Sequence, residues 1–296
     1  MKRYRDLAGD GGSDVLAQVA AQEARLRTRM AAVRRVVAVM SGKGGVGKSA
    51  ITVNLAAALA LEGARVGVLD ADLNGPALAK MLGVRDQRLR RGPEGVLPAV
   101  GALGIRVMSM DLLLPGDETP LTWQAPTPQR AHIWRQTAEV SALREFLADT
   151  AWGEQDYLWV DLPPGTDRFC DLHNLLPSPP VVVITTIPSE VARLVVQKSV
   201  TVARELKAPV AGLLENMVGY VCPACGVASE LFQPGAMAGR LAAEQAIPHL
   251  GQIPFDPAIG AAADRGIPFV VQGRQTAAGK ALTAAAVAIR AFTEAT

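Results

Sequence analysis

The stretch that decides the fold is Gly42-Lys43-Gly44-Gly45-Val46-Gly47-Lys48-Ser49, which fits the pattern G-x-x-x-x-G-K-[ST]. An apolar run at residues 36–40 precedes it, and a helix-like run at residues 49–61 follows it. Glycines let the backbone fold around phosphate groups, and a helix that begins near Lys48 adds the positive end of its dipole. The pattern therefore predicts a phosphate-binding loop between a strand and a helix.

Two side chains of this loop have expected roles in nucleotide binding. Lys48 should neutralise charge on the β- and γ-phosphates of ATP, and the Ser49 hydroxyl should bind Mg²⁺. A glycine-rich turn without a ligand is the alternative, and it does not account for the Lys-Ser pair. The predicted nucleotide-binding residues of the loop are Gly42, Gly44, Gly45, Val46, Gly47, Lys48, Ser49 and Ala50.

Short β-branched runs alternate with helix-like segments along the rest of the chain. The expected strands are residues 36–40, 65–69, 105–110, 157–160, 181–185, 210–214 and 250–253. The expected helices are residues 49–61, 137–148, 189–206 and 276–294. This alternation predicts an α/β fold, a doubly wound and mostly parallel sheet with helices on both faces. Residues 86–128, rich in Gly, Pro and Arg, should form surface excursions around one strand.

The N-terminal part of the chain differs in composition from the rest. Residues 1–35 are predicted to be a helical extension, with a break at residues 10–13 and a helix from residue 14 to residue 35. This segment has eight Lys and Arg residues and four acidic residues, and its net positive charge could bind an acidic partner. The alternative is a solvated helix that packs loosely on the domain. Residues 36–296 should form one P-loop ATPase domain.

Composition limits the possible partners and compartments. With 49% hydrophobic and 20% charged residues, the chain is too apolar for intrinsic disorder. Its longest apolar runs are far shorter than the roughly 20 residues that span a bilayer. A net charge of +2 provides no global field for nucleic acid or an anionic membrane, and we expect neither as a partner. Three Cys residues indicate a reducing compartment, so we expect a cytoplasmic protein.

Acidic residues follow two of the expected strands, where ligands of open α/β sheets bind. Asp161 fits the role of a Mg²⁺ ligand, Asp70 should lie near the metal, and Asp72 fits the role of orienting the attacking water. Pro163-Pro164-Gly165 would form a switch in which the Gly165 N–H senses the γ-phosphate. The alternative for each aspartate is a helix N-cap.

Two of the three cysteines form the pair Cys222-Pro223-Ala224-Cys225, and such a pair suits a soft metal or an iron–sulfur cluster. Two thiolates do not complete a site, and the chain has no second pair. A two-fold dimer that supplies two plus two cysteines is the economical solution. A zinc-binding knuckle, a redox dithiol and a purely structural pair remain alternatives. Cys170 is expected to be a buried free thiol.

These motifs together resemble a known family. Lys43, directly after the first loop glycine, resembles the signature lysine of the deviant Walker A group, which includes MinD, ParA and the nitrogenase iron protein. Over residues 36–267, the order of motifs is similar to that of the Mrp/ApbC family of iron–sulfur cluster carrier ATPases. The further motifs that carry this resemblance are Asp70-Ala71-Asp72-Leu73-Asn74-Gly75-Pro76, Trp152-Gly153-Glu154-Gln155-Asp156-Tyr157, Asp161-Leu162-Pro163-Pro164-Gly165-Thr166, Glu215-Asn216-Met217 and Cys222-Pro223-Ala224-Cys225-Gly226.

The resemblance implies an ATP-binding and ATP-hydrolysing carrier that transfers a cluster to apo-proteins. It implies a homodimer that sandwiches ATP, in which Lys43 reaches the nucleotide of the facing subunit and acts in catalysis with Lys48 and Asp72. It also implies that Asn216 contacts the adenine. Cys222 and Cys225 of both subunits would bridge one [4Fe–4S] cluster.

Some residues depart from the family pattern. Asp167-Arg168 follows the switch where the family usually has Gly-Asp, so we expect slow hydrolysis. Gln136-Thr137 follows Trp134-Arg135 where the family tends to have Gly-Pro. Two other functions stay open: a ParA- or MinD-like positioning ATPase, and a reductase resembling the nitrogenase iron protein. The first leaves the Cys pair unexplained, and cluster transfer to an apo-acceptor separates the carrier from the reductase.

Overall fold

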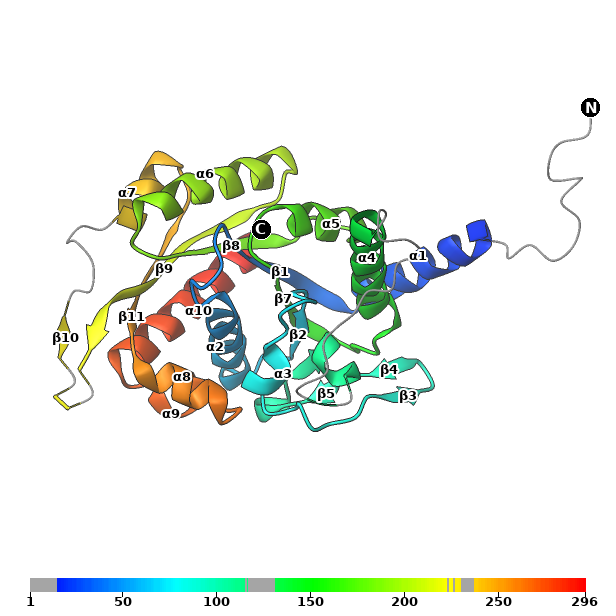
Figure 1. The fold of residues 1–296 in the computed structure, drawn as a ribbon, viewed down its shortest axis with the longest axis horizontal. Helices are drawn as coiled ribbons and strands as arrows, with labels where there is room; N and C mark the ends of the chain where they lie inside the picture. The colour runs from blue at the N-terminus through cyan, green and yellow to red at the C-terminus, as the bar shows by residue number, and fades with distance from the viewer. Residues whose placement is uncertain (1–14, 115, 117–130, 223, 226, 230–236) are drawn as a thin grey trace, which may run out of the picture.

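The computed structural model describes residues 15–114, 116, 131–222, 224–225, 227–229 and 237–296. Within this part of the chain, a nine-stranded sheet runs in the order β10-β9-β8-β1-β7-β2-β6-β5, and β11 pairs with β9 (Figure 1). Its strands are β1 (Val33–Ser41), β2 (Val66–Asp70), β5 (Ala99–Val100), β6 (Arg106–Met108), β7 (Gln155–Asp161), β8 (Val181–Thr186), β9 (Val210–Val221), β10 (Ala228–Ser229) and β11 (His249–Phe255). A separate hairpin joins β3 (Arg90–Gly92) to β4 (Gly95–Leu97).

Helices cover both faces of this sheet, which confirms the predicted doubly wound α/β fold (Figure 1). One face packs against α2 (Lys48–Leu61), α3 (Leu78–Met81), α8 (Pro257–Asp264), α9 (Phe269–Gly273) and α10 (Ala277–Ala295). The other face packs against α1 (Val15–Ala31), α4 (Ala131–Asp149), α5 (Asp167–Leu175), α6 (Glu190–Glu205) and α7 (Met237–Glu244). Short 3₁₀ turns occur at η2 (Ala102–Gly104) and η3 (Met110–Leu113).

The central strands are parallel, and their register brings the acidic strand ends together. β1 lies between β7 and β8, and β7 lies between β1 and β2. Along β1, Val37 and Val39 contact one hydrophobic core while Ala38 and Met40 contact the other, as strand alternation requires. Asp161 is the register partner of both Val39 and Asp70. The two carboxylates therefore end neighbouring strands at one edge of the sheet.

Every expected strand is present, but several ends differ from the prediction. β1 begins at Val33 because Val33 and Arg35 already pair with β7. The strand expected at residues 105–110 ends at Met108, where Ser109 caps η3 by accepting a hydrogen bond from the Asp111 N–H. β9 continues to Val221 because β11 and then β10 pair with its second half. In residues 86–128, the described part forms the β3–β4 hairpin, β5 and η2 around β6.

The N-terminal helix corrects one prediction. It ends at Ala31 rather than at residue 35, because strand pairing with β7 begins at Val33. It is also not loosely packed, since Leu26 and Met30 are buried in the same core as α4, and Arg25 pairs with Asp149 of α4 at 3.0 Å. The proposed boundary at residue 35 lies inside β1. The predicted break at residues 10–13 lies outside the described residues.

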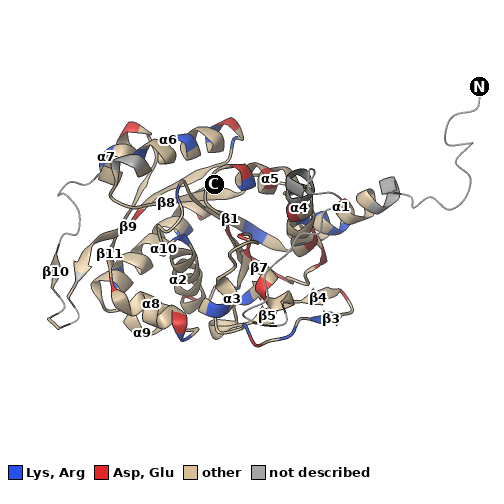
Figure 2. Ribbon diagram, in the orientation of Figure 1, with Lys and Arg blue, Asp and Glu red and all other residues tan. Residues whose placement is uncertain are grey.

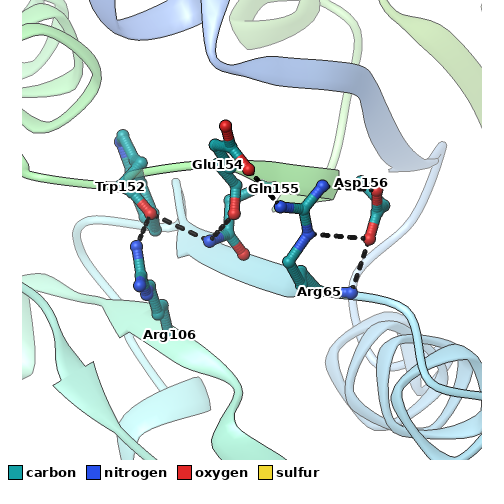
Figure 3. A network of polar contacts seen from close by, with 6 residues as sticks. All are labelled: Arg65, Arg106, Trp152, Glu154, Gln155 and Asp156. Carbon is teal, nitrogen blue, oxygen red and sulfur yellow. Dashed lines mark hydrogen bonds and ion pairs between the residues drawn. The ribbon is translucent and has the colours of Figure 1, made fainter.

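The motif at residues 152–157 has a structural role at the start of β7 (Figure 3). The Arg65 guanidinium pairs with Asp156 at 3.0 Å and with Glu154. The Trp152 carbonyl accepts hydrogen bonds from Arg106 and, at 2.9 Å, from Gln155. These contacts hold the N-terminal ends of β2, β6 and β7 together. The motif therefore lies at the opposite edge of the sheet from the phosphate loop.

Charged residues lie mainly on the elements that surround the sheet. Figure 2 shows most of the central strands in tan, with blue and red segments distributed over the outer helices and the hairpin.

None of the helices in the described part of the chain combines the length and the apolar character needed to cross a membrane.

The packing of α1 leads to a stability prediction. Leu26→Ala should lower the free energy of unfolding by about 2–5 kcal/mol, because it leaves a cavity between α1 and α4. Val19→Ala on the exposed side of the same helix should change it by less than about 0.5 kcal/mol. Urea unfolding measures both. Equal effects for the two substitutions would show that α1 is not part of the core.

Candidate functional site

The phosphate loop lies between β1 and α2, as the sequence predicts. Helix α2 begins at Lys48, directly after Gly47, which has φ +80°. A Cβ at Gly47 would lie 2.4 Å from the Asn216 Nδ2, so both the backbone conformation and the space demand glycine here. At Gly42, an added Cβ would lie 2.0 Å from the Val195 Cγ1, because α6 packs directly against the loop. The loop is thus fixed from two sides.

The fully buried carboxylate of Asp161 connects the phosphate loop to β7. Lys48 Nζ lies 2.8 Å from Asp161 Oδ1, and the Ser49 hydroxyl donates to Asp161 Oδ2 at 2.6 Å. The Thr52 hydroxyl donates to Oδ1 at 2.8 Å. The structure therefore brings together Lys48, Ser49 and Asp161, which the sequence placed in one site. Thr52 was not predicted, although its place one helical turn after Lys48 is a usable signal.

Asp70 is also buried, but its carboxylate is engaged by its own loop. Oδ2 accepts hydrogen bonds from the N–H groups of Ala77 and Leu78 at 2.9 and 3.0 Å, and from the Ser109 hydroxyl at 3.2 Å. Burial and then the nearby charge of Asp161 raise the pKa of Asp70 to about 7. The other oxygen, Oδ1, accepts a hydrogen bond from the Asp72 N–H at 3.3 Å. The role of Asp70 near a metal ion remains a prediction.

Asp72 lies at the same edge and is half-buried. Burial raises the pKa of its carboxyl, against the lowering effect of the Lys48 charge. Its backbone carbonyl accepts a hydrogen bond from the Gly75 N–H at 3.2 Å, which closes a turn in the loop after β2. Asp72 is therefore close enough to Lys48 for the lysine charge to act on its carboxyl. Its role in orienting the attacking water remains a prediction.

The predicted switch follows β7 and is bound to β1. The Gly165 N–H donates to the Ser41 carbonyl at 2.9 Å, and Gly165 has φ +101°. Helix α5 begins two residues later at Asp167. Cys170 of α5 is partly buried, and burial followed by the charges of Asp167 and Asp171 raises the pKa of its thiol.

Asn216 lies in β9, and the Cys pair follows the end of the same strand. The Asn216 amide donates to the Val46 carbonyl at 2.9 Å, so the middle of β9 contacts the phosphate loop directly. Near the end of β9, Tyr220 stacks on Phe255 of β11, with ring centroids 6.3 Å apart and planes at 25°. Cys222 comes just after this stacked pair.

The cysteine pair lies at a hairpin between β9 and β10. The Cys222 N–H donates to the Val227 carbonyl at 2.9 Å, and Cys225 is exposed. Hydrogen bonds from the Cys225 and Ala224 N–H groups, and from the Cys225 thiol, lower the pKa of the Cys222 thiol. The arrangement presents two adjacent sulfurs, one of which has a lowered pKa. Pro223 and Gly226 lie outside the described residues.

Beside Asp72 and the switch is a cleft of about 340 Å³ between α4, α5 and the loop after β2. Its lining includes Ala71, Leu73, Asn74, Gln136, Glu139, Pro163, Pro164, Asp167, Arg168 and Asp171. Arg168 and Gln136 are two of the positions at which the chain departs from the family pattern. Lys43 is exposed at the phosphate loop, and its role in a facing subunit remains a prediction.

This fold and loop define the class of protein: a phosphate loop between a strand and a helix, facing acidic strand ends on a parallel sheet, is that of a P-loop NTPase. The family model described as ParA, NUBPL iron-transfer P-loop NTPase, matches residues 32–290. The chain belongs to this family. The resemblance inferred from the sequence motifs is confirmed.

Individual relatives agree with this assignment. A protein of Methanocaldococcus jannaschii named iron-sulfur cluster carrier protein is 43% identical over 254 residues, which cover 86% of this chain and 83% of the relative. A nucleotide-binding protein of Archaeoglobus fulgidus, solved in complex with ADP, is 34% identical with a TM-score of 0.69 over 83% of this chain and 92% of its own. The cell division ATPase MinD of Pyrococcus furiosus shares the fold, with a TM-score of 0.59 and 20% identity over 88% of this chain and 99% of its own.

The raised pKa of Asp70 predicts a pH dependence of stability. Between the unfolded value near 4 and the folded value of about 7, the folded protein binds more protons than the unfolded chain. The free energy of unfolding should therefore fall as the pH rises through this window, by at most about 1.4 kcal/mol per pH unit. In Asp70→Asn this fall should be smaller.

Urea unfolding at several pH values, with EDTA and without nucleotide, measures the effect. Asp156→Asn is the matched control, because Arg65 lowers the pKa of Asp156, so this residue contributes no fall in the same window. A wild-type pH slope in Asp70→Asn would contradict the assignment.

Proposed function

We propose that this protein is an iron–sulfur cluster carrier that holds its cargo between two subunits, passes it to apo-proteins, and uses ATP binding and slow hydrolysis to control that transfer. The observation that carries the proposal is the Cys222 and Cys225 pair in the hairpin that directly follows β9, the strand whose Asn216 contacts the phosphate loop. Membership of an iron-transfer NTPase family, and relatives named as cluster carriers, support it.

The cargo site needs ligands from a second copy of the chain. Among the described residues, no group of three or more His, Cys, Asp and Glu side chains is arranged to hold a metal ion. Each subunit would therefore supply Cys222 and Cys225 to a [4Fe–4S] cluster at the two-fold axis of a homodimer. The backbone N–H groups that favour the Cys222 thiolate in the free protein favour cluster binding for the same reason.

The nucleotide site has the chemistry that Mg²⁺ and ATP require. Ser49 Oγ and the Asp161 carboxylate lie 2.6 Å apart, and both are hard oxygen ligands of the kind that Mg²⁺ prefers. A bound Mg²⁺ would neutralise phosphate charge. Lys48, released from Asp161, would bind the β- and γ-phosphates, and Asp72 would orient the attacking water. Lys43 would reach the nucleotide of the facing subunit.

The switch would respond to the γ-phosphate through one hydrogen bond. The Gly165 N–H is bound to the Ser41 carbonyl in this structure. When ATP binds, the Gly165 N–H would donate to a phosphate oxygen instead of the Ser41 carbonyl. After hydrolysis, this hydrogen bond to the phosphate would be lost. Because α5 begins directly after the switch, this exchange would also shift the start of the helix.

Strand β9 would couple the nucleotide to the cargo. Asn216 contacts the phosphate loop through Val46, and Cys222 follows the same strand six residues later. A nucleotide that moves Asn216 would therefore displace the cysteine hairpin. A positioning ATPase would have no use for this connection. A reductase would share it, and cluster transfer to an apo-acceptor separates that function from a carrier.

The nucleotide site predicts graded effects for three substitutions. Lys48→Ala should abolish ATP hydrolysis and weaken ATP binding, because it removes the main positive charge of the loop. Lys43→Ala should preserve ATP binding by the single chain better than it preserves turnover. Asp72→Asn should bind ATP and hydrolyse it at least tenfold more slowly, because only the water-orienting carboxylate is lost. Calorimetric binding and phosphate release measure these effects.

Each result has a distinct consequence. Turnover of Lys48→Ala at the wild-type rate would refute the phosphate-loop assignment. Unchanged turnover in Lys43→Ala would remove only the role of this lysine in the facing subunit. Lys80→Ala, an exposed lysine of α3, serves as the charge-matched control and should leave turnover unchanged.

The cysteine pair predicts metal content and oligomeric state together. After anaerobic reconstitution, the wild type should contain about one cluster per dimer, whereas Cys222→Ala and Cys225→Ala should each lose iron and sulfide. Cys170→Ala should keep them, because this thiol belongs to α5 and not to the hairpin. Iron and sulfide analysis with size-exclusion mass measurement tests this.

ATP binding should survive in all three cysteine variants. A stable monomer that carries a full cluster would contradict the shared site. A dimer that holds stoichiometric zinc after expression in iron-replete cells would instead support an ATPase switch whose two subunits are joined by zinc at the cysteine pairs.

A further inference from the structure

A chain of polar contacts, centred on the buried Glu139, connects three elements around the cleft beside Asp72. Arg168, in the first turn of α5, pairs through Nη2 with Glu139 Oε2 of α4. The other oxygen of Glu139 accepts a hydrogen bond from Asn74 Nδ2 at 2.9 Å. Asn74 belongs to the loop after β2, two residues beyond Asp72. The three side chains thus join α5, α4 and the loop in one line.

The geometry of Arg168 makes this connection rigid. Its side chain is 16% exposed and that of Glu139 is 6% exposed, so the ion pair is largely shielded from water. A second guanidinium nitrogen, Nη1, lies 2.9 Å from Asp171 Oδ2 on the same helix. A planar guanidinium held by two carboxylates has little freedom to rotate. Glu139 is therefore held in place for Asn74.

Both ends of the chain adjoin residues with proposed roles in hydrolysis. Pro163 and Pro164 of the switch line the same cleft as Asn74 and Arg168, and Arg168 comes three residues after Gly165. At the other end, Asn74 lies in the short turn that begins at Asp72 and closes with the Gly75 N–H. A shift of this turn would move the Asp72 carboxylate.

We propose that Arg168, Glu139 and Asn74 are positioning residues that fix the Asp72 loop relative to the switch, and so set the rate of ATP hydrolysis without taking part in ATP binding. This inference rests on the ATPase activity proposed above. Its physical basis is that an attacking water must be aligned closely, and a displacement of about 1 Å can cost on the order of a hundredfold in rate. None of the three side chains needs to touch the nucleotide for this effect.

The experiment must separate positioning from simple stabilisation. Replacing Arg168 alone would take an opposite charge away from the buried Glu139 carboxylate and destabilise the protein. The double variant Arg168→Met with Glu139→Leu removes both charges and keeps similar volumes, so its thermal midpoint should stay within a few degrees of the wild type. Asn74→Ala is the second variant, because it cuts the chain at the loop and leaves the ion pair intact.

For the double variant and for Asn74→Ala, we expect kcat for ATP hydrolysis to fall about tenfold or more while KM for ATP changes less than about twofold. Because the residues act as one unit, adding Asn74→Ala to the double variant should cause little further loss. The control is Arg25→Met with Asp149→Leu, an ion pair between α1 and the far end of α4, and it should retain the wild-type kcat.

Several results would overturn the inference. A kcat within twofold of the wild type in the double variant would do so. An unchanged kcat in Asn74→Ala would do so too, because the ion pair would then only hold α4 and α5 together. A fall in kcat with an equal rise in KM would show that the residues act on binding instead. A wild-type protein that binds ATP without hydrolysing it would refute the proposed ATPase, and the positioning role with it.

Discussion

The fully buried carboxylate of Asp161 is the constraint on which the rest of the site depends. A carboxylate in the protein interior is tolerated only if it is paired, and leaving one unpaired costs several kcal/mol. Asp161 is paired with Lys48 and accepts hydrogen bonds from Ser49 and Thr52, all three within about the first turn of α2. These contacts fix the start of α2 against the end of β7. The loop that precedes α2 is thereby fixed at the end of β7.

The length of β9 is the second feature that organises the molecule. β8 and β11 pair with it on opposite sides, and β10 pairs with its end. The strand therefore continues past its pairing with β8, which ends at Glu215, and the rings of Tyr220 and Phe255 stack near its end. Its middle contacts the phosphate loop and its end presents the cysteine pair. One element thus touches both ligand sites that we propose, with no need for a long chain of contacts between them.

Much of this arrangement could be predicted from the sequence, because its signals are local. The phosphate loop is a contiguous pattern, and the meeting of Asp70 with Asp161 follows from parallel strands that end at one edge. Contacts between distant segments could not be predicted. The pairing of Val33 with Gln155 shortened the N-terminal helix, and nothing in the local pattern around Glu139 indicates a bond to Arg168.

The same difference between local patterns and distant contacts explains why some motif residues have contacts that their motifs do not predict. The motif at residues 152–157 was informative as part of a family pattern, yet its side chains hold the start of β7 and lie away from the site. Asp70, predicted near the metal, has an oxygen engaged by two backbone N–H groups and a hydroxyl. Sequence patterns locate such residues, but their hydrogen-bond partners determine what each carboxylate is free to do.

The coupling that we propose between nucleotide and cargo runs through one strand, β9. Coupling is reciprocal, so a nucleotide that alters the cysteine hairpin must be bound with a different affinity once the hairpin holds a cluster. Anaerobic calorimetry with a non-hydrolysable ATP analogue and Mg²⁺ can compare the cluster-loaded protein with the cluster-free protein. We expect the dissociation constants of the ATP analogue for the two forms to differ about fivefold or more. Equal dissociation constants for the two forms would contradict it.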